Sequence, residues 1–374
     1  MVATPEAPKY TAVSFNRDDS CFCCCHSTGF QVFNTDPLQS KIENVFSGSV
    51  GRAKLLNRSN YIALIGGDGS KPAFPLNKLI IWDDLLQKET LKLSFMSLVQ
   101  DVFLTRLYIV AQVDGALCVY RFKSYPQRVG SDIPTSRGSP VGFQMNGKNQ
   151  GILVYESATH PGQLHVATLE TKDTDVGDSV FFPTTIIKAH KTTVRLVKLN
   201  RQSTLLATSS VKGTVIRVFN VTNGTLVNEF RRGSDPAEIY AMSFNPSGDK
   251  LCVVSNKQTL HIYQLGGGSN GQQEANRRHA FQGLVPQFKY LQSKWSMCSS
   301  HLYNPTLHMQ ERYDRSDRCS VGWCNENNDT VVLVWHNLGI YERYVIMKEP
   351  NPTKGKEYEE KWQIVRESWR DLSP

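Results

Sequence analysis

The chain has 374 residues, with 42 lysines and arginines against 34 aspartates and glutamates, for a formal net charge of +8. This basic excess favours acidic partners such as anionic membranes or nucleic acid and leaves the fold undetermined. No segment has the roughly 18 uncharged apolar residues of a membrane span, and the first residues lack a signal-peptide core, so we expect a soluble cytoplasmic protein.

A repeated pattern organises the chain. Segments 14–33, 198–219 and 243–263 each read as a strand end, a polar turn led by asparagine, a strand, a short turn and a strand ending in an aromatic residue. The turn residues Asn200 and Asn245 are 45 positions apart, and Asn16 precedes Asn200 by 184, close to four such periods. A period of roughly 40–45 residues with this content is typical of β-propeller blades.

The three segments then belong to blades 1, 5 and 6, and the intervals between them hold matching pairs of strands. The pairs predicted for blades 2, 3, 4 and 7 are 61–67 with 78–83, 107–111 with 116–120, 151–155 with 162–169, and 330–335 with 339–346. We therefore predict an all-β, WD40-like, seven-bladed β-propeller that forms a single domain over 1–374. Because a closed ring removes sheet edges, we expect strands from the two chain ends to share a blade.

Four cysteines lie close together in the run Cys21-Phe22-Cys23-Cys24-Cys25. A metal or redox cluster is one interpretation, but the second half of a zinc-site spacing is missing. Free cysteine is often buried, so we favour a buried strand and predict no metal site and no cofactor. The odd total of nine cysteines also suits a reducing compartment.

A strand-like run from Gly224 ends in the tetrapeptide Phe230-Arg231-Arg232-Gly233. Successive side chains of an extended chain point to opposite sides, so Arg231 and Arg232 are suited to two anions rather than to one. The guanidinium group matches phosphate bidentately and stays charged at physiological pH. The pair therefore predicts two phosphate-binding sites at the boundary between blades 5 and 6.

Polar side chains flank this boundary on both blades. The blade 5 candidates are His190, Ser209, Ser210, Thr214 and Arg217, and the blade 6 candidates are Ser255, Lys257, Thr259 and His261. Hydroxyls and imidazoles donate to phosphate oxygens. Such residues also serve structural networks between propeller strands, and His190 resembles an ordinary blade-entry histidine, so both interpretations stay open.

Two segments fall outside the period. The first is a loop in blade 6 at about 264–293, where cationic and apolar side chains suit an anionic membrane interface, at Arg277, Arg278, Phe281, Leu284 and Val285. Incidental apolar residues are the alternative, and the run 266–271 also reads as a glycine-rich linker, native or engineered. The second is a C-terminal extension at about 349–374 that we expect to pack on the propeller.

The tetrapeptide at 230–233, between the fifth and sixth blades, resembles the signature of the PROPPIN (WIPI) family of phosphoinositide-binding propellers. Segments 209–219, 223–233, 77–84 and 294–296 follow the family pattern as well. The resemblance covers roughly 10–345, and segment 71–78 is most similar to the fungal Hsv-like branch.

The resemblance implies a peripheral membrane scaffold that binds phosphatidylinositol 3-phosphate and phosphatidylinositol 3,5-bisphosphate at two rim sites. One site would use Arg231 with the blade 5 candidates, and the other would use Arg232 with the blade 6 candidates. The blade 6 loop would be the membrane-inserting loop. The resemblance further implies a monomer that acts on autophagic, endosomal or vacuolar membranes, with autophagy proteins as partners.

The sequence gives less support to other classes of function. The alternative is a WD40 scaffold for protein–protein interaction without lipid specificity, in which Arg231 and Arg232 pair with acidic partner residues. Nucleic-acid binding is disfavoured because the basic residues form no dense stripe interleaved with aromatics. We predict no enzyme, because the chain has no G-x-S-x-G motif, no metal-ligand spacing and no nucleophile with an assignable base.

Overall fold

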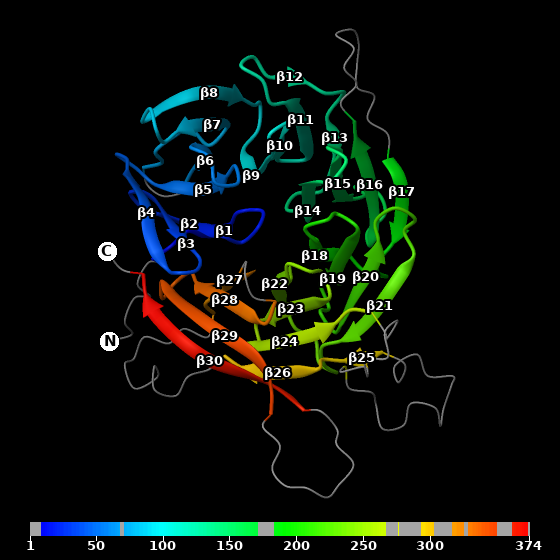
Figure 1. The fold of residues 1–374 in the computed structure, drawn as a ribbon. Coiled ribbons are helices and arrows are strands. Elements are labelled where there is room, and N and C mark those ends of the chain that lie inside the picture. The colour runs from blue at the N-terminus through cyan, green and yellow to red at the C-terminus, as the bar shows by residue number, and fades with distance from the viewer. Residues whose placement is uncertain are drawn as a thin grey trace, which may run out of the picture.

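Short apolar runs separated by polar and glycine-containing turns form thirty strands in the computed structural model of the chain (Figure 1). The structure describes residues 9–67, 71–170, 183–266, 276, 293–302, 316–324, 328–349 and 361–372. Neighbouring strands in these ranges pair into seven sheets, each of which is one blade of a propeller. The prediction of an all-β, single-domain, seven-bladed propeller is therefore confirmed.

Each of the first three blades is an antiparallel sheet whose strands follow one another in the chain. Blade 1 contains β1 (Ala12–Phe15), β2 (Cys21–His26), β3 (Gly29–Asn34) and β4 (Gln39–Val45). Blade 2 contains β5 (Val50–Leu55), β6 (Tyr61–Gly66), β7 (Lys78–Asp83) and β8 (Lys88–Ser94). Blade 3 contains β9 (Val99–Leu104), β10 (Tyr108–Val113), β11 (Ala116–Arg121), and two short partners of β11, β12 (Gln127–Arg128) and β13 (Ile133–Pro134).

The remaining blades continue the ring. Blade 4 contains β14 (Val141–Met145), β15 (Gly151–Glu156), β16 (Gln163–Leu169) and β17 (Pro183–Lys188). Blade 5 contains β18 (Val194–Leu199), β19 (Leu205–Ser210), β20 (Val215–Asn220), β21 (Leu226–Arg231) and the parallel β25 (Lys294–Trp295). Blade 6 contains β22 (Ile239–Phe244), β23 (Lys250–Ser255), β24 (Thr259–Gln264) and β26 (Cys298–His301). Blade 7 contains β27 (Cys319–Trp323), β28 (Thr330–Trp335), β29 (Ile340–Lys348) and β30 (Trp362–Asp371).

The asparagines of the sequence repeat stabilise the turn between the first two strands of their blades. The side-chain Oδ1 atoms of Asn16, Asn200 and Asn245 each accept a hydrogen bond from the backbone N–H five residues later, at 3.1, 2.9 and 2.9 Å. All three side chains are buried, so these bonds satisfy amides that water does not reach. The asparagine recurs in blades 1, 5 and 6 because these three turns use the same side-chain acceptor.

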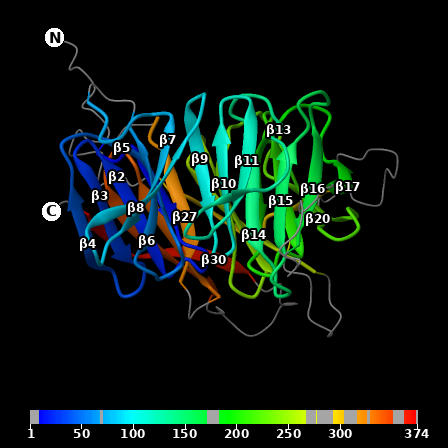
Figure 2. The same ribbon diagram turned by 90° about the horizontal axis from the view of Figure 1, so that it is seen from above.

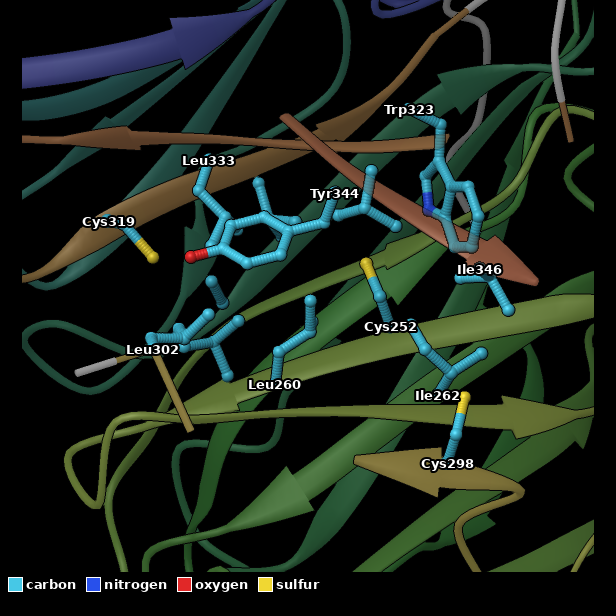
Figure 3. Close-up of a cluster of buried hydrophobic side chains, with 14 of the residues drawn as sticks. Cys252, Leu260, Ile262, Cys298, Leu302, Cys319, Trp323, Leu333, Tyr344 and Ile346 are labelled. Atoms are coloured by element: carbon cyan, nitrogen blue, oxygen red, sulfur yellow. The ribbon is translucent and has the colours of Figure 1, made fainter. Parts of the chain in front are cut away.

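Hydrophobic clusters lie between neighbouring blades, and seen from the side the blades stand next to one another around the ring (Figure 2). Figure 3 shows the cluster between blades 6 and 7, where the fully buried Trp323 lies beside Cys252 and Tyr344. Each blade therefore buries both of its faces. Burial of this kind contributes about 25 cal/mol for each Å² of apolar surface removed from water.

The cysteine-rich run forms β2, as the buried-strand interpretation predicts. Cys21, Cys23 and Cys25 pack against blade 2, whereas Cys24 packs in the cluster between blades 7 and 1. Alternate thiols thus point to opposite faces of one strand. Among the described residues no group of three or more His, Cys, Asp or Glu side chains is arranged to hold a metal ion.

The expectation that the two chain ends share a blade is wrong for the described part of the chain. Blade 1 takes all of its strands from β1–β4, and blade 7 takes all of its strands from β27–β30. The fourth strand of blade 7 is β30, which lies inside the segment that we expected as a C-terminal extension at 349–374. Because β30 completes blade 7, no N-terminal strand is needed there.

Contacts between the first and last blades close the ring instead. The backbone N–H of Tyr10 donates to the carbonyl of His336 at 3.0 Å, and its hydroxyl donates to the carbonyl of Leu372 at 3.0 Å. The Ser320 hydroxyl donates to the carbonyl of Val13 at 2.8 Å. The first and last described residues of the chain therefore lie at the same blade boundary, between blades 7 and 1.

This burial predicts low thiol reactivity. All nine cysteines are free and buried, and burial raises the pKa of Cys23 and Cys24 well above the usual value for a thiol. Because the thiolate is the reactive form, we expect slow reaction of the native protein with Ellman's reagent at neutral pH and rapid modification of all nine thiols in guanidinium chloride. Rapid modification of several thiols in the native state would contradict this packing.

Candidate functional site

The strand β21 separates the two arginines because its two faces contact different blades. Phe230 lies opposite Ile216 of β20 and stacks on Tyr263 of blade 6, with ring centroids 4.7 Å apart. Glu229 and Arg231 occupy the alternate positions, so they lie on the face turned toward blade 4. The sequence-based expectation of opposite orientations therefore has a structural basis in the packing of Phe230.

On the blade 4 side of β21, Arg217 and Glu229 form an ion pair, with Nε 2.8 Å from Oε2. The Arg217 Nη1 also donates to the carbonyl of Ala189 at 2.6 Å. The other Glu229 oxygen accepts a hydrogen bond from the Ser293 hydroxyl at 2.8 Å. Arg217 and Glu229 thus link β20 and β21 to the chain segment that precedes blade 5.

His190 lies on the same side and its Nε2 is 2.9 Å from the hydroxyl of Thr208. Thr208 lies opposite Arg217, so it faces the same way, and sequence analysis missed it. Nothing in the sequence marks a threonine in the middle of a buried strand as part of a site. Its pairing with Arg217 appears only once the strand register is known. The contact between His190 and Thr208 is also what we expect if this histidine serves a structural network between strands and not a binding site.

Arg231 is 9% exposed and its Nη1 lies 3.4 Å from the carbonyl oxygen of Gly233. Its own carbonyl accepts a hydrogen bond from the Tyr263 hydroxyl at 3.1 Å. Ser210 is buried at the end of β19, and Thr214 is half-buried directly before β20. Arg231 pairs across the sheet with Val215, the residue after Thr214.

Ser209 faces the other way from the rest of the first set. It lies opposite Ile216, which packs with Phe230 in the core between blades 5 and 6. Its side chain is fully buried, and its Oγ has no hydrogen-bond partner in the described part of the chain. Ser209 is therefore on the face of blade 5 that turns toward blade 6, away from the face of Arg231.

Arg232 lies on this second side and is 8% exposed. Its Nε donates to the carbonyl of Gly213 at 2.9 Å, and its Nη2 donates to the carbonyl of Asp235. Gly213 has φ +59°, and a Cβ there would approach the carbonyl oxygen of Ala237 to 1.7 Å. Only glycine therefore fits the turn that holds Arg232.

Three blade 6 candidates face Arg232. Thr259 and His261 alternate along β24 with Tyr263, whose ring packs against blade 5, and Ser255 ends the neighbouring strand on the same face. The His261 ring nitrogens contact hydroxyls on both sides, with Nε2 3.1 Å from Thr259 and Nδ1 3.2 Å from Ser296.

The other blade 6 positions differ in exposure. Lys257 is exposed on the turn between β23 and β24, and its backbone N–H donates to the Ser255 hydroxyl at 3.4 Å. Ser296, a partner of His261, was missed because it follows a long segment that lies outside the sequence repeat. The number of residues between β24 and Ser296 therefore does not predict that the two lie side by side.

Both histidines are neutral at physiological pH. Burial, with a further contribution from Arg217, lowers the pKa of His190 to about 4. Burial, followed by Arg232 and His301, lowers the pKa of His261 to about 4. Positive charge at the two sites therefore comes from the arginines, while the imidazoles supply hydrogen bonds.

The segment between β24 and β25 is held at both ends beside these sites. The Asn276 side chain accepts from the backbone N–H of Gln264 at 2.9 Å and donates to its carbonyl at 2.7 Å. β25 then pairs in parallel with Phe230 and Arg231. The candidate membrane-loop residues lie outside the described residues, at Arg277, Arg278, Phe281, Leu284 and Val285.

These features define a class of protein, a seven-bladed propeller in which arginine, hydroxyl and imidazole side chains gather on both faces of β21, around the boundary between blades 5 and 6. The sequence profile of the PROPPIN family matches residues 86–290. The chain belongs to the PROPPIN family, known for phosphoinositide-binding autophagy proteins. It is a family of β-propeller scaffolds and not of enzymes.

Individual relatives support the fungal branch of the family. The chain is 40% identical to SVP1-like protein 2 of Saccharomyces cerevisiae, over 98% of this chain and 96% of the relative. Among solved structures it is similar to Hsv2 of Kluyveromyces marxianus, with a TM-score of 0.77 and 26% identity over 98% of this chain and 100% of that one. Hsv2 of Kluyveromyces lactis gives 0.77 and 28% over the same shares.

No helix in the described ranges is long and apolar enough to span a membrane.

The depressed histidine pKa values predict a pH-dependent stability. Because the folded pKa of His261 is about 4 and an unfolded histidine titrates near 6.5, the unfolded state binds more protons between these values. The contribution of His261 to the free energy of unfolding is therefore full above pH 6.5 and is lost as the pH falls toward 4. We expect His261→Gln to flatten the urea stability profile in this window, whereas His160→Gln on an exposed turn changes it less; equal slopes for both variants would contradict the burial of His261.

Proposed function

We propose that this chain is a peripheral membrane scaffold that binds phosphatidylinositol 3-phosphate and phosphatidylinositol 3,5-bisphosphate through two rim sites. The observation that carries the proposal is the division of Arg231 and Arg232 between the two faces of β21, with hydroxyl and imidazole groups on each side. Family membership supports the same ligand class.

The first site combines Arg231 with His190, Ser210, Thr214 and Arg217. The guanidinium group of Arg231 is buried beside that of Arg217, and one carboxylate, Glu229, interacts with both, pairing with Arg217 and having its pKa lowered by both arginines. Two guanidinium groups with one carboxylate leave a positive site that suits an anion. Ser209, on the opposite face of β19, is the weakest member of the set.

The second site combines Arg232 with Ser255, Thr259 and His261, and with Lys257 at its exposed margin. Within the described residues, Arg232 donates its hydrogen bonds to the backbone carbonyls of Gly213 and Asp235. A phosphomonoester carries about −1.5 to −2 charges, and its oxygens match a guanidinium fork with neighbouring hydroxyls. Each such charge-assisted hydrogen bond contributes about 1.5–3 kcal/mol.

Two moderate sites on one rigid body bind a membrane more tightly than either site alone. Once one headgroup is bound, the second encounter becomes intramolecular, and avidity can rise by about 10²–10⁴. Arg277, Arg278, Phe281, Leu284 and Val285 of the blade 6 loop would add cationic contact and apolar insertion at the interface. We assign the protein to autophagic, endosomal or vacuolar membranes, with autophagy proteins as partners.

The arginine pair provides the test. We expect Arg231→Thr with Arg232→Thr to abolish flotation with liposomes that contain phosphatidylinositol 3-phosphate, since both sites lose their cation. Each single substitution should weaken flotation by about tenfold in affinity, because one charge-assisted contact is lost and the second site remains. Circular dichroism and thermal melting check that the propeller stays folded.

A matched control has the same change in net charge. Arg58→Thr with Arg106→Thr removes two exposed arginines from blades 2 and 3 and should leave flotation unchanged. Wild-type flotation that is equal on phosphatidylserine liposomes, or that survives loss of both Arg231 and Arg232, would favour the protein-interaction scaffold without lipid specificity.

A further inference from the structure

A second group of arginines lies around the propeller axis, on strands remote from β21. Arg52 is the third residue of β5, Arg195 is the second residue of β18, and Arg318 directly precedes β27. These strands are the first of blades 2, 5 and 7, and they lie closest to the centre of the ring (Figure 1). We call Arg52, Arg195 and Arg318 the axial arginine cluster.

The cluster has more positive than negative charge. Arg195 and Arg318 both contact the same carboxylate oxygen of Glu238, which precedes β22 of blade 6, and the Arg318 contact is 2.8 Å long. Arg52 is exposed and has no ion pair or side-chain hydrogen bond in the described part of the chain. The cluster therefore has three guanidinium groups and one carboxylate, which Arg195 and Arg318 share.

Neighbouring groups extend this positive field. Lys54 follows Arg52 by two positions on β5, so it points to the same side, where it pairs with Asp101 at 3.5 Å. Burial, followed by the charges of Arg52 and Arg318, lowers the pKa of His336 to about 4. Two arginines from blades 2 and 7 therefore act on one imidazole, which brings Arg52 and Arg318 into one electrostatic environment.

Exposed apolar side chains lie on the same face of the propeller. Met96 and Leu98 lie in the connection between β8 and β9, and Val211 lies in the turn after β19. These connections meet the end of the ring at which β5, β9 and β18 begin, because Val211 donates its backbone N–H to Thr193, just before β18. Met96 is fully exposed, so its side chain packs on nothing in the described structure.

We propose that this face binds an acidic, partly apolar peptide segment of a partner protein, with its carboxylates on the axial arginine cluster. Arginine forks match carboxylates bidentately, and Met96 and Val211 offer contact for the apolar side chains of the same segment. A free inositol phosphate would contact the arginines but would have no apolar group to place on Met96 and Val211. The site is separate from the rim, because Arg52 lies on an innermost strand and Arg231 ends the fourth strand of its blade.

Fluorescence anisotropy tests this site with a labelled peptide in which Asp and Glu alternate with Leu and Phe. Arg52→Glu is the decisive variant, because Arg52 has no intramolecular ion pair to lose and the fold should be retained. We expect it to weaken peptide binding by at least about tenfold. The matched control is Arg58→Glu on the turn after β5, at the opposite end of the same strand, which should leave binding unchanged.

Further variants and ligands distinguish a peptide from an inositol phosphate as the ligand of this face. Met96→Ser with Val211→Ser should weaken the peptide about tenfold and leave any binding of inositol hexakisphosphate unchanged. The proposal is overturned if the wild-type protein binds the acidic peptide no more tightly than its Asn and Gln counterpart, or if Arg52→Glu and Arg58→Glu behave alike. Arg231→Thr with Arg232→Thr should retain peptide binding, so failure of the lipid sites and failure of this site are distinguishable.

Discussion

Burial of both faces of every blade is the constraint on which the rest of the structure depends. Seven sheets packed around one axis leave no solvent-facing sheet surface in the middle strands, which is why β6, β10 and β28 are almost wholly buried. Exposed charged side chains are then concentrated on the innermost strands, the outermost strands and the connections, whereas polar side chains on middle strands, such as Thr208 and His261, lie beside hydrogen-bonding partners. This arrangement leaves two places where arginines gather. The lipid-site candidates around β21 lie toward the rim, and the axial arginine cluster lies at the axis.

The same constraint explains how two adjacent arginines come to lie on opposite faces of one strand. Phe230 must enter the core against Tyr263, and this contact determines that Arg231 turns to blade 4 and Arg232 to blade 6. Burial also keeps the nearby imidazoles of His190 and His261 neutral, since a second positive charge beside a buried guanidinium group would be unfavourable. Charge and hydrogen bonding are therefore supplied by different residues at each site.

Much of this arrangement follows from sequence, because the features concerned are local or periodic. The asparagines at 16, 200 and 245 reveal the blade repeat because each accepts a hydrogen bond within its own turn. The opposite orientations of Arg231 and Arg232 follow from their being neighbours in one strand. Features that depend on long-range pairing were not predictable. The orientation of Ser209 depends on two successive strand registers. β30 mixes charged residues with Trp362 and Trp369 because its outer edge faces solvent, so from sequence it resembles an extension. The partners Thr208 and Ser296 likewise become neighbours of the histidines only through the fold.

The peptide bond between Arg231 and Arg232 has a consequence for how the protein would leave a membrane. The backbones of both residues are held by hydrogen bonds, the first through the Tyr263 hydroxyl and the second through an N–H donated to the carbonyl of Thr214, so the two side chains leave the strand at a fixed separation. Two lipids held at this separation would detach in sequence, and the one still bound would keep its empty neighbour within reach of the bilayer. The lifetime on the membrane would then depend on how fast lipids diffuse laterally into the vacant site, which makes it a property of membrane composition as much as of the protein.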